Sequence, residues 1–349
     1  QTDYTDTFNA LGYKHEMIAG GDLYEDKALR NNAATAGLPA YSNLTTLVGT
    51  PNDGATVNTA RTIPLNNFHA QTLGVYAQDT LHLNTQFKLV GGLRFDQFDA
   101  NCEDTSQRTF SMKQSLWSPR VGAIWQPNEN SSFYTSYGTS YNTSADTYQY
   151  AVNLSITGTQ ATLANTPPEK SRNLEVGAKF DVFNQKALLG IAVFRSEKYN
   201  ERNTDIDSVA NQFLLSGKRH ATGMEFNFAG RLTPLWEVFY NHTWIPSASI
   251  DESNITSGNA QRLGDRPALT PKQSASLWTS YLLSSQWRIA GGLNHRGEQS
   301  PEGNRNVVAA AFTTVDAMAE YSFSEATTLK LNVSNLTNKL YADQLYSGH

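Results

Sequence analysis

The chain has 349 residues, of which only 17% are charged and 39% are hydrophobic, and its mean hydropathy is -0.47. The longest uninterrupted apolar run, residues 187–194, is far below the roughly 18 residues that a membrane-spanning helix needs, which excludes a helical membrane protein. The net charge of -5 argues against nucleic acid as a partner, and the single cysteine, Cys102, excludes a disulfide framework within this chain.

Alternation of apolar and polar residues recurs along almost the whole chain. From Leu174 to Val182 every second residue is apolar, while Glu175, Lys179 and Asp181 fall on the other face. A period of two is typical of β-strands with one apolar face and one polar face. The pattern predicts about fourteen strands. They are expected near residues 4–11, 15–26, 69–83, 87–101, 109–126, 131–143, 170–183, 187–200, 213–231, 236–248, 272–284, 287–299, 311–324 and 328–342.

The connections between these strands alternate between short and long. Short turns are predicted at 12–14 and 84–86, for example, whereas long loops are predicted at 28–68, 139–169 and 247–271. All short turns then lie at one end of the sheet and all long loops at the other, as in bacterial outer-membrane barrels. A soluble all-β protein would not combine strands this long with loops this unequal, so the pattern favours a barrel.

Aromatic residues support the same orientation, because membrane barrels carry aromatic girdles at both interfaces. Those next to the short turns are predicted to form the periplasmic girdle: Trp125, Trp236, Trp287, Tyr321 and Phe323. Tryptophans near the opposite strand ends are predicted to form the outer girdle: Trp117, Trp244 and Trp278.

Several segments, spread in order over nearly the entire chain, carry a more specific signal. They are GGLRFD at 91–96, SPRVGAIWQP at 118–127, SFYTSYGTSY at 132–141, PEKSRNLEVGAK at 168–179, AVFRSEKYN at 192–200, ATGMEFNFAGRLTPLW at 221–236 and LNVSNLTNKLY at 331–341. Together they resemble the C-terminal part of a TonB-dependent outer-membrane receptor of the ferric-siderophore branch.

The resemblance implies an antiparallel, up-and-down transmembrane β-barrel of the twenty-two-stranded class, filled by a plug domain. Residues 1–349 are then expected to be a partial barrel domain. The plug, the segment that engages TonB, the signal peptide, the first strands and the closing strand are expected to lie outside this chain. Two open sheet edges in lipid would leave backbone groups unsatisfied, so these strands alone are not expected to be a finished barrel.

The resemblance also implies a function. The parent protein is expected to bind a ferric siderophore at the cell surface and to import it through the bacterial outer membrane, energised by the TonB-ExbB-ExbD system. Outer-membrane lipid is a further expected partner. No cofactor and no enzymatic activity are expected, because the iron is carried within the siderophore. The residues themselves leave open a passive porin-like channel, an outer-membrane barrel enzyme and an adhesin-like barrel. Within the family, cobalamin, haem and oligosaccharide are alternative ligands.

The predicted long loops are rich in tyrosine and arginine, although loops of many barrels are polar and aromatic. Aromatic rings and guanidinium groups suit an anionic, catechol-bearing iron complex through stacking, cation–π contact and charge-assisted hydrogen bonds. The candidate ligand contacts are Tyr41, Arg61, Tyr141, Tyr148, Tyr150, Arg202 and Arg305. Further loop arginines are Arg219, Arg262 and Arg266. A catecholate ligand is slightly favoured over a hydroxamate, with Tyr148, Tyr150 and Arg61 as the first contacts to test.

Other polar residues point to structural roles. No histidine pair has the spacing of a metal site, and no serine stands in a GxSxG context, so neither a metal centre nor a hydrolase is predicted. Most histidines fall on predicted strands, which weakens the case for haem: His15, His82, His220, His242 and His295. The charges of the polar strand faces are predicted to pair with the plug or the barrel wall: Arg94, Asp96, Glu175, Lys179, Asp181 and Glu225.

Overall fold

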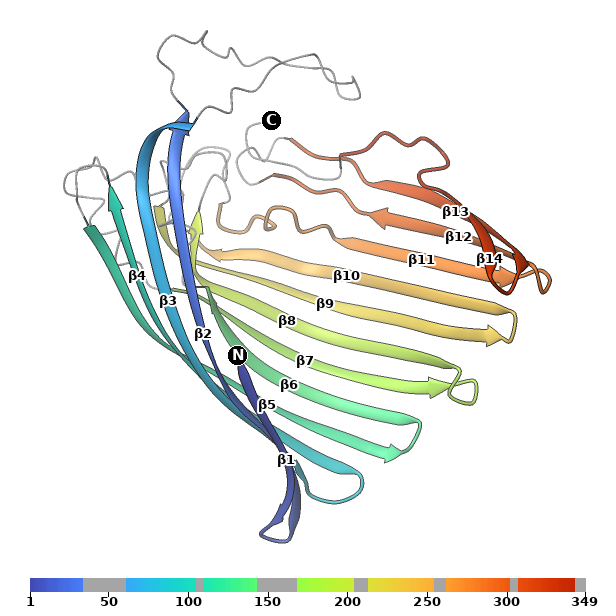
Figure 1. Cartoon of the computed structure of the whole chain (residues 1–349), viewed down its shortest axis with the longest axis horizontal. Helices are drawn as coiled ribbons and strands as arrows, with labels where there is room; N and C mark the ends of the chain where they lie inside the picture. Colours follow the sequence, from blue (N-terminus) through green and yellow to red (C-terminus); the bar gives the residue numbers. More distant parts are fainter. Residues whose placement is uncertain are drawn as a thin grey trace.

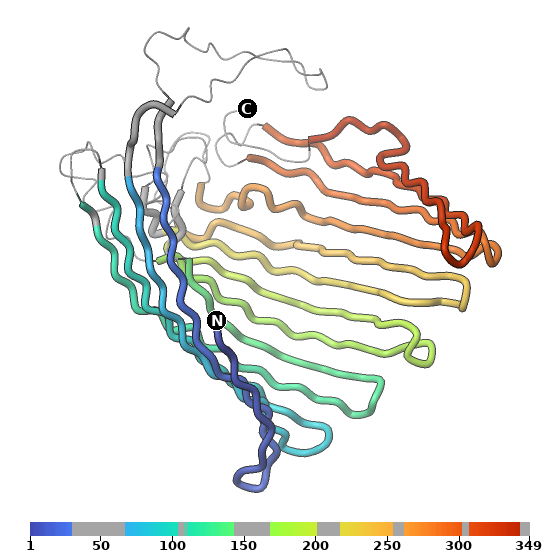
Figure 2. Tube along the Cα trace, in the orientation of Figure 1, coloured from blue at the N-terminus to red at the C-terminus, as the bar shows by residue number. Residues whose placement is uncertain are grey.

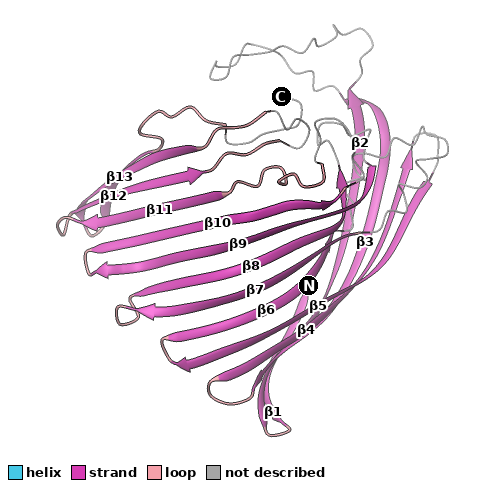
Figure 3. Cartoon of the chain, turned by 180° about the vertical axis from the view of Figure 1, so that it is seen from behind, coloured by secondary structure: helices cyan, strands magenta, loops and turns pink. Residues whose placement is uncertain are grey.

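The computed structural model describes residues 1–33, 61–104, 109–142, 168–203, 213–253, 262–301 and 307–342. These residues form a fourteen-stranded antiparallel sheet in which each strand pairs with the strands before and after it in the chain. The sheet curls strongly and leaves β1 and β14 at its two edges, unpaired with each other over the described ranges (Figure 1). The described elements are all strands, which confirms the predicted all-β, up-and-down fold (Figure 3).

All fourteen predicted strands are present. They are β1 (Thr2–Ala10), β2 (Tyr13–Ala33), β3 (Arg61–His82), β4 (Phe87–Asp104), β5 (Thr109–Asn128), β6 (Ser131–Asn142), β7 (Glu169–Val182), β8 (Ala187–Asn203), β9 (Phe213–Thr233), β10 (Trp236–Glu252), β11 (Gln273–Leu282), β12 (Trp287–Arg296), β13 (Phe312–Ser324) and β14 (Thr327–Val333). No helix in these ranges is long and apolar enough to cross a bilayer.

The short turns all lie along one rim of the sheet, as predicted (Figure 2). The turn between β1 and β2 shows the local reason. Leu11 and Gly12 both have positive φ angles, of 52° and 84°. Two central residues with positive φ make the kind of tight turn whose twist matches that of a β-hairpin, so the chain reverses without a loop.

The strands β2 and β3 extend farthest beyond their predicted ends. The register of β2 against β3 continues out to Ala33 opposite Arg61, so both strands enter the predicted loop 28–68 from its two ends. Residues such as Asn31, Asn32 and Asn66 lack apolar-polar alternation. The apolar-polar alternation in the sequence therefore ends before the backbone pairing of β2 with β3 ends.

The last strand is shorter than predicted, because β14 ends at Val333 and residues 334–342 are irregular. Asn335 and Asn338 have positive φ angles, of 49° and 50°. The Asn335 side chain also accepts a hydrogen bond from the Lys339 amide and donates one to the Lys339 carbonyl. Asparagine tolerates the left-handed region and closes turns with its own side chain, so this segment leaves the sheet.

The sheet has two chemically different faces. On the apolar face, large side chains such as Leu174 and Val176 on β7 and Ile191 and Val193 on β8 are exposed. These residues share a face because side chains two positions apart point the same way. The polar face carries the charged residues between them, as in barrels whose outer surface meets lipid and whose interior is hydrated.

Aromatic rings follow the short-turn rim of the apolar face, as predicted for the periplasmic girdle. Phe87 stacks on Trp125, Trp125 on Phe133, and Phe133 meets Phe180 edge-on. Trp236 and Trp287 are exposed nearby, and Trp287 packs on Tyr321, which in turn contacts Phe323. At the opposite side of the apolar face Trp117 and Trp244 are exposed, which confirms two of the three tryptophans predicted for the outer girdle.

The prediction for Trp278 is wrong. Trp278 lies two residues from Ser280, whose hydroxyl donates to Glu237, and it therefore points to the polar face. Its ring covers Gly292 on β12, where a Cβ atom would come within 2.5 Å of the ring. Glycine on one strand thus leaves space for a large polar-face side chain on the next.

The same arrangement holds at Gly177, beneath Tyr134. A Cβ atom at Gly177 would lie 2.5 Å from Tyr134 Cζ, whereas a Cβ atom at Gly91 would meet no atom within 4 Å. We therefore expect Gly177→Val in the full-length protein to lower the free energy of unfolding by about 1–3 kcal/mol, since overpacking displaces the ring. Gly91→Val, on the apolar face, is the matched control. Urea titration followed by heat-modifiable gel mobility measures both, and equal midpoints would contradict this packing.

Candidate functional site

The polar face of β2 to β4 is organised around one arginine. Arg94 Nη1 lies 2.8 Å from Asp22 Oδ2, and Arg94 Nη2 lies 2.6 Å from Asp96 Oδ1. The guanidinium carbon is 5.5 Å from the centre of the Tyr76 ring. Gly74 opposite leaves room for this group, since a Cβ atom there would collide with Arg94 and Asp22. The ion pairing predicted for Arg94 and Asp96 is confirmed, since both residues pair within the sheet.

A second group lies on β5 to β7. Tyr134 donates a hydrogen bond of 2.6 Å to Glu175 Oε1, and Lys179 Nζ is 5.6 Å from the centre of the same ring. Arg120 Nη1 donates to the Gln78 side chain at 3.2 Å. These residues line a hollow of about 420 Å³ on the polar face. Glu175 and Lys179, two charges predicted to pair with the plug or the barrel wall, therefore contact a tyrosine of the sheet itself.

A third group forms a row across β9 to β13, near the short-turn rim. Glu237 lies 2.8 Å from Arg231 Nε and 3.8 Å from Arg288 Nη1, and Arg288 Nε lies 4.0 Å from Glu320 Oε1. Ser280 donates to the same Glu237 carboxylate. By contrast, the predicted wall charges Asp181 and Glu225 have exposed side chains.

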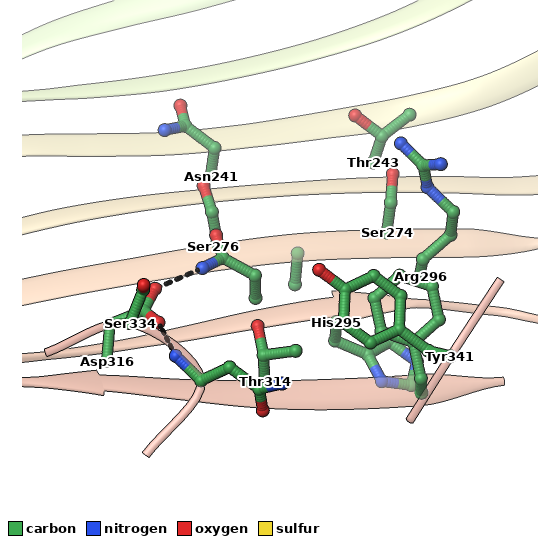
Figure 4. Close-up of a pocket in the computed structure, with 14 residues that line it drawn as sticks. Asn241, Thr243, Ser274, Ser276, His295, Arg296, Thr314, Asp316, Ser334 and Tyr341 are labelled. Atoms are coloured by element: carbon green, nitrogen blue, oxygen red, sulfur yellow. Dashed lines mark hydrogen bonds between the residues drawn. The ribbon is translucent and has the colours of Figure 1, made fainter. Parts of the chain in front are cut away.

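A polar hollow of about 530 Å³ lies over β10 to β13 (Figure 4). Its polar lining includes Asn241, Ser274, Ser276, Asn294, Thr314 and Asp316. The Asp316 carboxylate accepts hydrogen bonds from the Asn294 amide group and from the Asn335 backbone amide. Tyr341 stacks on Phe312 at a ring distance of 4.2 Å, so residues 334–342 close one side of the hollow. Hydroxyl, amide and carboxylate groups of this kind suit a hydrated ligand or a polar protein segment.

Most predicted ligand contacts lie outside the described residues: Tyr41, Tyr148, Tyr150 and Arg305. Two others lie on strands that the prediction had left as loop. Arg61 is the first residue of β3, and Arg202, near the end of β8, pairs with Leu214. The backbones of Arg61 and Arg202 therefore lie at the ends of β3 and β8 that are opposite the short turns.

Tyr141 is on β6 and has a different surrounding from the one predicted. It pairs with Lys170, whose Nζ lies 5.6 Å from the centre of the Tyr141 ring. Lys170 shares the face of Leu174 and Val176, because these residues are an even number of positions apart on β7. Tyr141 is therefore on the outward, apolar side of the sheet and not on its polar face.

The loop between β10 and β11 contains two of the further arginines. Arg266 donates hydrogen bonds to the carbonyl oxygens of Ile245, Thr270 and Pro271. Burial lowers the pKa of the Arg266 guanidinium from its ordinary value, but an arginine remains protonated. Arg262 lies 3.6 Å from Asp265. Arg266 therefore ties the segment just before β11 to β10 at Ile245.

Four of the histidines on the described strands are each paired with one carboxylate. His15 contacts Asp79, His69 contacts Glu25, His82 contacts Glu16 and His220 contacts Asp251. Across the described ranges, no group of three or more histidine, cysteine, aspartate or glutamate residues is placed to hold a metal ion. These contacts were not visible in the sequence, because each joins residues on different strands.

Similarity to known proteins identifies the family. A family model described as "TonB dependent receptor-like, beta-barrel" matches residues 1–336. The chain belongs to this family. TonB-dependent receptors are outer-membrane receptors and transporters of bacteria rather than enzymes, which confirms the location and the class that the sequence predicted.

Several of the similar proteins are siderophore receptors by name. The probable TonB-dependent receptor BfrD of Bordetella pertussis is 27% identical over 100% of this chain and 50% of its own length. The catecholate siderophore receptor Fiu of Escherichia coli K12 is 24% identical over 98% of this chain and 47% of its own length. The crystal structure of the siderophore receptor PiuA from Acinetobacter baumannii superposes with a TM-score of 0.81 at 23% identity, covering 99% of this chain and 52% of that one. The chain spans about half the length of the curated relatives that it matches.

In this TonB-dependent receptor barrel, the polar face is the lumen wall, and Arg94 bonds two carboxylates on it, Asp22 and Asp96. We expect Arg94→Met to lower the free energy of unfolding by about 1–2 kcal/mol, because two neighbouring carboxylates lose their shared partner. Arg120→Met removes the same charge from the same face, but its partner is the neutral Gln78. We expect a change below about 0.5 kcal/mol there. Urea titration of the two full-length variants measures the difference, and equal losses would show that the ion pairs of Arg94 add nothing.

Proposed function

We propose that this chain forms part of the wall of a receptor that binds a ferric siderophore at the cell surface and imports it, energised through TonB. The observation that carries the proposal is the match of the family model to residues 1–336. Relatives named as siderophore receptors, among them Fiu and PiuA, support the ligand class. The hydrated, ion-paired lumen face is consistent with transport rather than with catalysis.

We infer that further strands complete the barrel, to the twenty-two-stranded class of such transporters. Among the described strands β1 and β14 are the edges of the sheet, and exposed backbone groups at such edges are costly in lipid. The lumen charges also suit contact with a plug domain. Asp181 and Glu225 are exposed on this face and are suitable partners for cations of a plug.

The proposed ligand is a ferric catecholate in preference to a hydroxamate. Tyrosines and arginines dominate the predicted loops, and a rim of this kind attracts a complex with net negative charge. Haem is disfavoured because four strand histidines are bonded to carboxylates: His15, His69, His82 and His220. Cobalamin and oligosaccharide remain alternatives that binding measurements separate.

Two other classes make different predictions for the whole protein. A passive porin would lack a plug domain, and an adhesin-like barrel would bind a macromolecule in place of an iron chelate. Reading the complete coding sequence tests the first, since the absence of a plug would end the transporter proposal. Saturable binding of a small ferric chelate tests the second.

The ligand contacts are tested with Arg61→Ala, Tyr148→Ala and Tyr150→Ala combined in the full-length receptor. We expect ferric-catecholate binding to weaken about 10- to 100-fold, because cation–π and charge-assisted contacts are lost. Tyr13→Ala is the control, since Tyr13 is exposed directly beside the short turn between β1 and β2. Titration with a set of ferric chelates, cobalamin and haem measures the affinities. Unchanged affinity for every ferric chelate would overturn these contacts, and binding of cobalamin or haem alone would overturn the ligand class.

A further inference from the structure

The apolar face carries a group of charges where its alternation would place only apolar side chains. Arg172 on β7, Arg195 on β8 and Lys218 on β9 lie around the buried carboxylate of Glu197. Lys170 lies two residues from Arg172 on the same face of β7, opposite Tyr199. We call the four cations and Glu197 the outer basic cluster. The three strands are neighbours in the sheet (Figure 1).

The orientation of the cluster follows from the register. Arg172 lies two residues from Leu174 on β7, and Arg195 lies two residues from Val193 on β8, so each shares a face with an exposed apolar side chain. The pairing of β7 with β8 runs from Lys170 to Val182 without a register shift. Arg172 and Arg195 therefore point outward, away from the lumen.

The depth of the cluster corresponds to the edge of the lipid-facing band. From Phe180, in the aromatic girdle, to Arg172 the strand rises about 26 Å at ~3.3 Å per residue, or about 20 Å along the membrane normal for a strand tilted by ~40°. The apolar band of such barrels is about 25 Å tall. Trp244, in the outer girdle, pairs with Met224, which pairs with Val193. Arg195 is thus the next outward-facing residue beyond this tryptophan level.

One carboxylate organises the cluster but does not neutralise it. Glu197 is only 6% exposed and accepts hydrogen bonds from Arg172 Nε, from Arg195 Nε at 3.0 Å and from the Tyr199 hydroxyl at 2.6 Å. Lys218 Nζ lies 3.9 Å from the same carboxylate. The side chains of Arg172 and Arg195 remain 44% and 45% exposed.

The charge of the neighbouring groups leaves a positive surplus. Next to Glu197, His220 is paired with Asp251 of β10. Glu252 of β10 lies directly opposite Lys218 and shares its face. The four cations of the cluster against the carboxylates of Glu197, Asp251 and Glu252 leave one positive charge, or two when His220 is protonated. Aromatic rings frame these cations, since Tyr199 lies under Arg172 and Lys218 and Tyr141 lies under Lys170.

We propose that the outer basic cluster binds the phosphate-bearing headgroup of an outer-leaflet lipid. Guanidinium groups recognise phosphate by paired hydrogen bonds, and charges at this depth are otherwise costly. Tyrosine is enriched at the interface between membrane and water. Below the cluster, Leu174, Val176 and Val193 offer apolar contact for the acyl chains of the same lipid, which free phosphate could not use.

The test measures binding of bisphosphorylated lipid A to the full-length receptor in detergent by native mass spectrometry. K170Q/K218Q removes two cations and keeps both arginine contacts with Glu197. R172Q/R195Q/E197Q removes the centre of the cluster together with its buried carboxylate, so that Glu197 is not left buried without its two arginines. The control is K27Q/K113Q, because Lys27 and Lys113 share the apolar face and are each paired with one carboxylate, Glu25 and Asp99.

We expect the affinity of each cluster variant for lipid A to fall by about tenfold or more. The control should bind lipid A as the wild type does. Dephosphorylated lipid A should bind the wild type as weakly as lipid A binds the variants, and millimolar inorganic phosphate should not compete. Equal binding by wild type and both cluster variants overturns the proposal. It is also overturned if the control loses as much affinity, or if inorganic phosphate displaces the lipid.

Discussion

Every backbone amide and carbonyl group that crosses a bilayer must find its hydrogen-bond partner within the protein, and this constraint determines the structure. A ladder of antiparallel neighbours meets it from β1 to β14. The same ladder forces a period of two, which separates the lipid side from the lumen side. The principal buried apolar cluster, around Phe68 and Phe98, is small, and large residues such as Val176 are exposed. Lipid on one side and a hydrated lumen on the other take the place of a large core.

This dependence on backbone pairing explains which parts of the fold the sequence could predict. Strand number and turn placement were predictable, because apolar-polar alternation reports directly which face of a paired strand meets lipid. The signal disappears where both faces are polar, and so the outer ends of β2 and β3, up to Ala33 opposite Arg61, were missed. At Asn335 the opposite error occurred, because a turn interrupts a segment whose composition resembles a strand.

The lumen site was predictable only as a set of residue types. Arg94 meets Asp22 across a separation of 72 residues, and only the register of three strands brings the two together. Trp278 is different, because its face could have been found by counting. Ser276 and Ser280 each lie two residues from Trp278 on β11 and so point to the same face, and these small, polar residues mark the lumen side. Parity is therefore a better guide to an aromatic residue's role than its distance from a strand end.

The register shifts of the sheet show where the bilayer constraint ends. Among the described pairings, shifts occur near the short turns, as between Trp125 and Asn128, or at and beyond the outer girdle, as between Trp244 and Ser247. Between these levels β7 and β8 pair without interruption. A bulge leaves a backbone group unpaired, which water can satisfy and lipid cannot. The outer basic cluster begins at the same level as the outer shifts, so backbone irregularity and outward charge mark one boundary, where lipid gives way to polar surroundings.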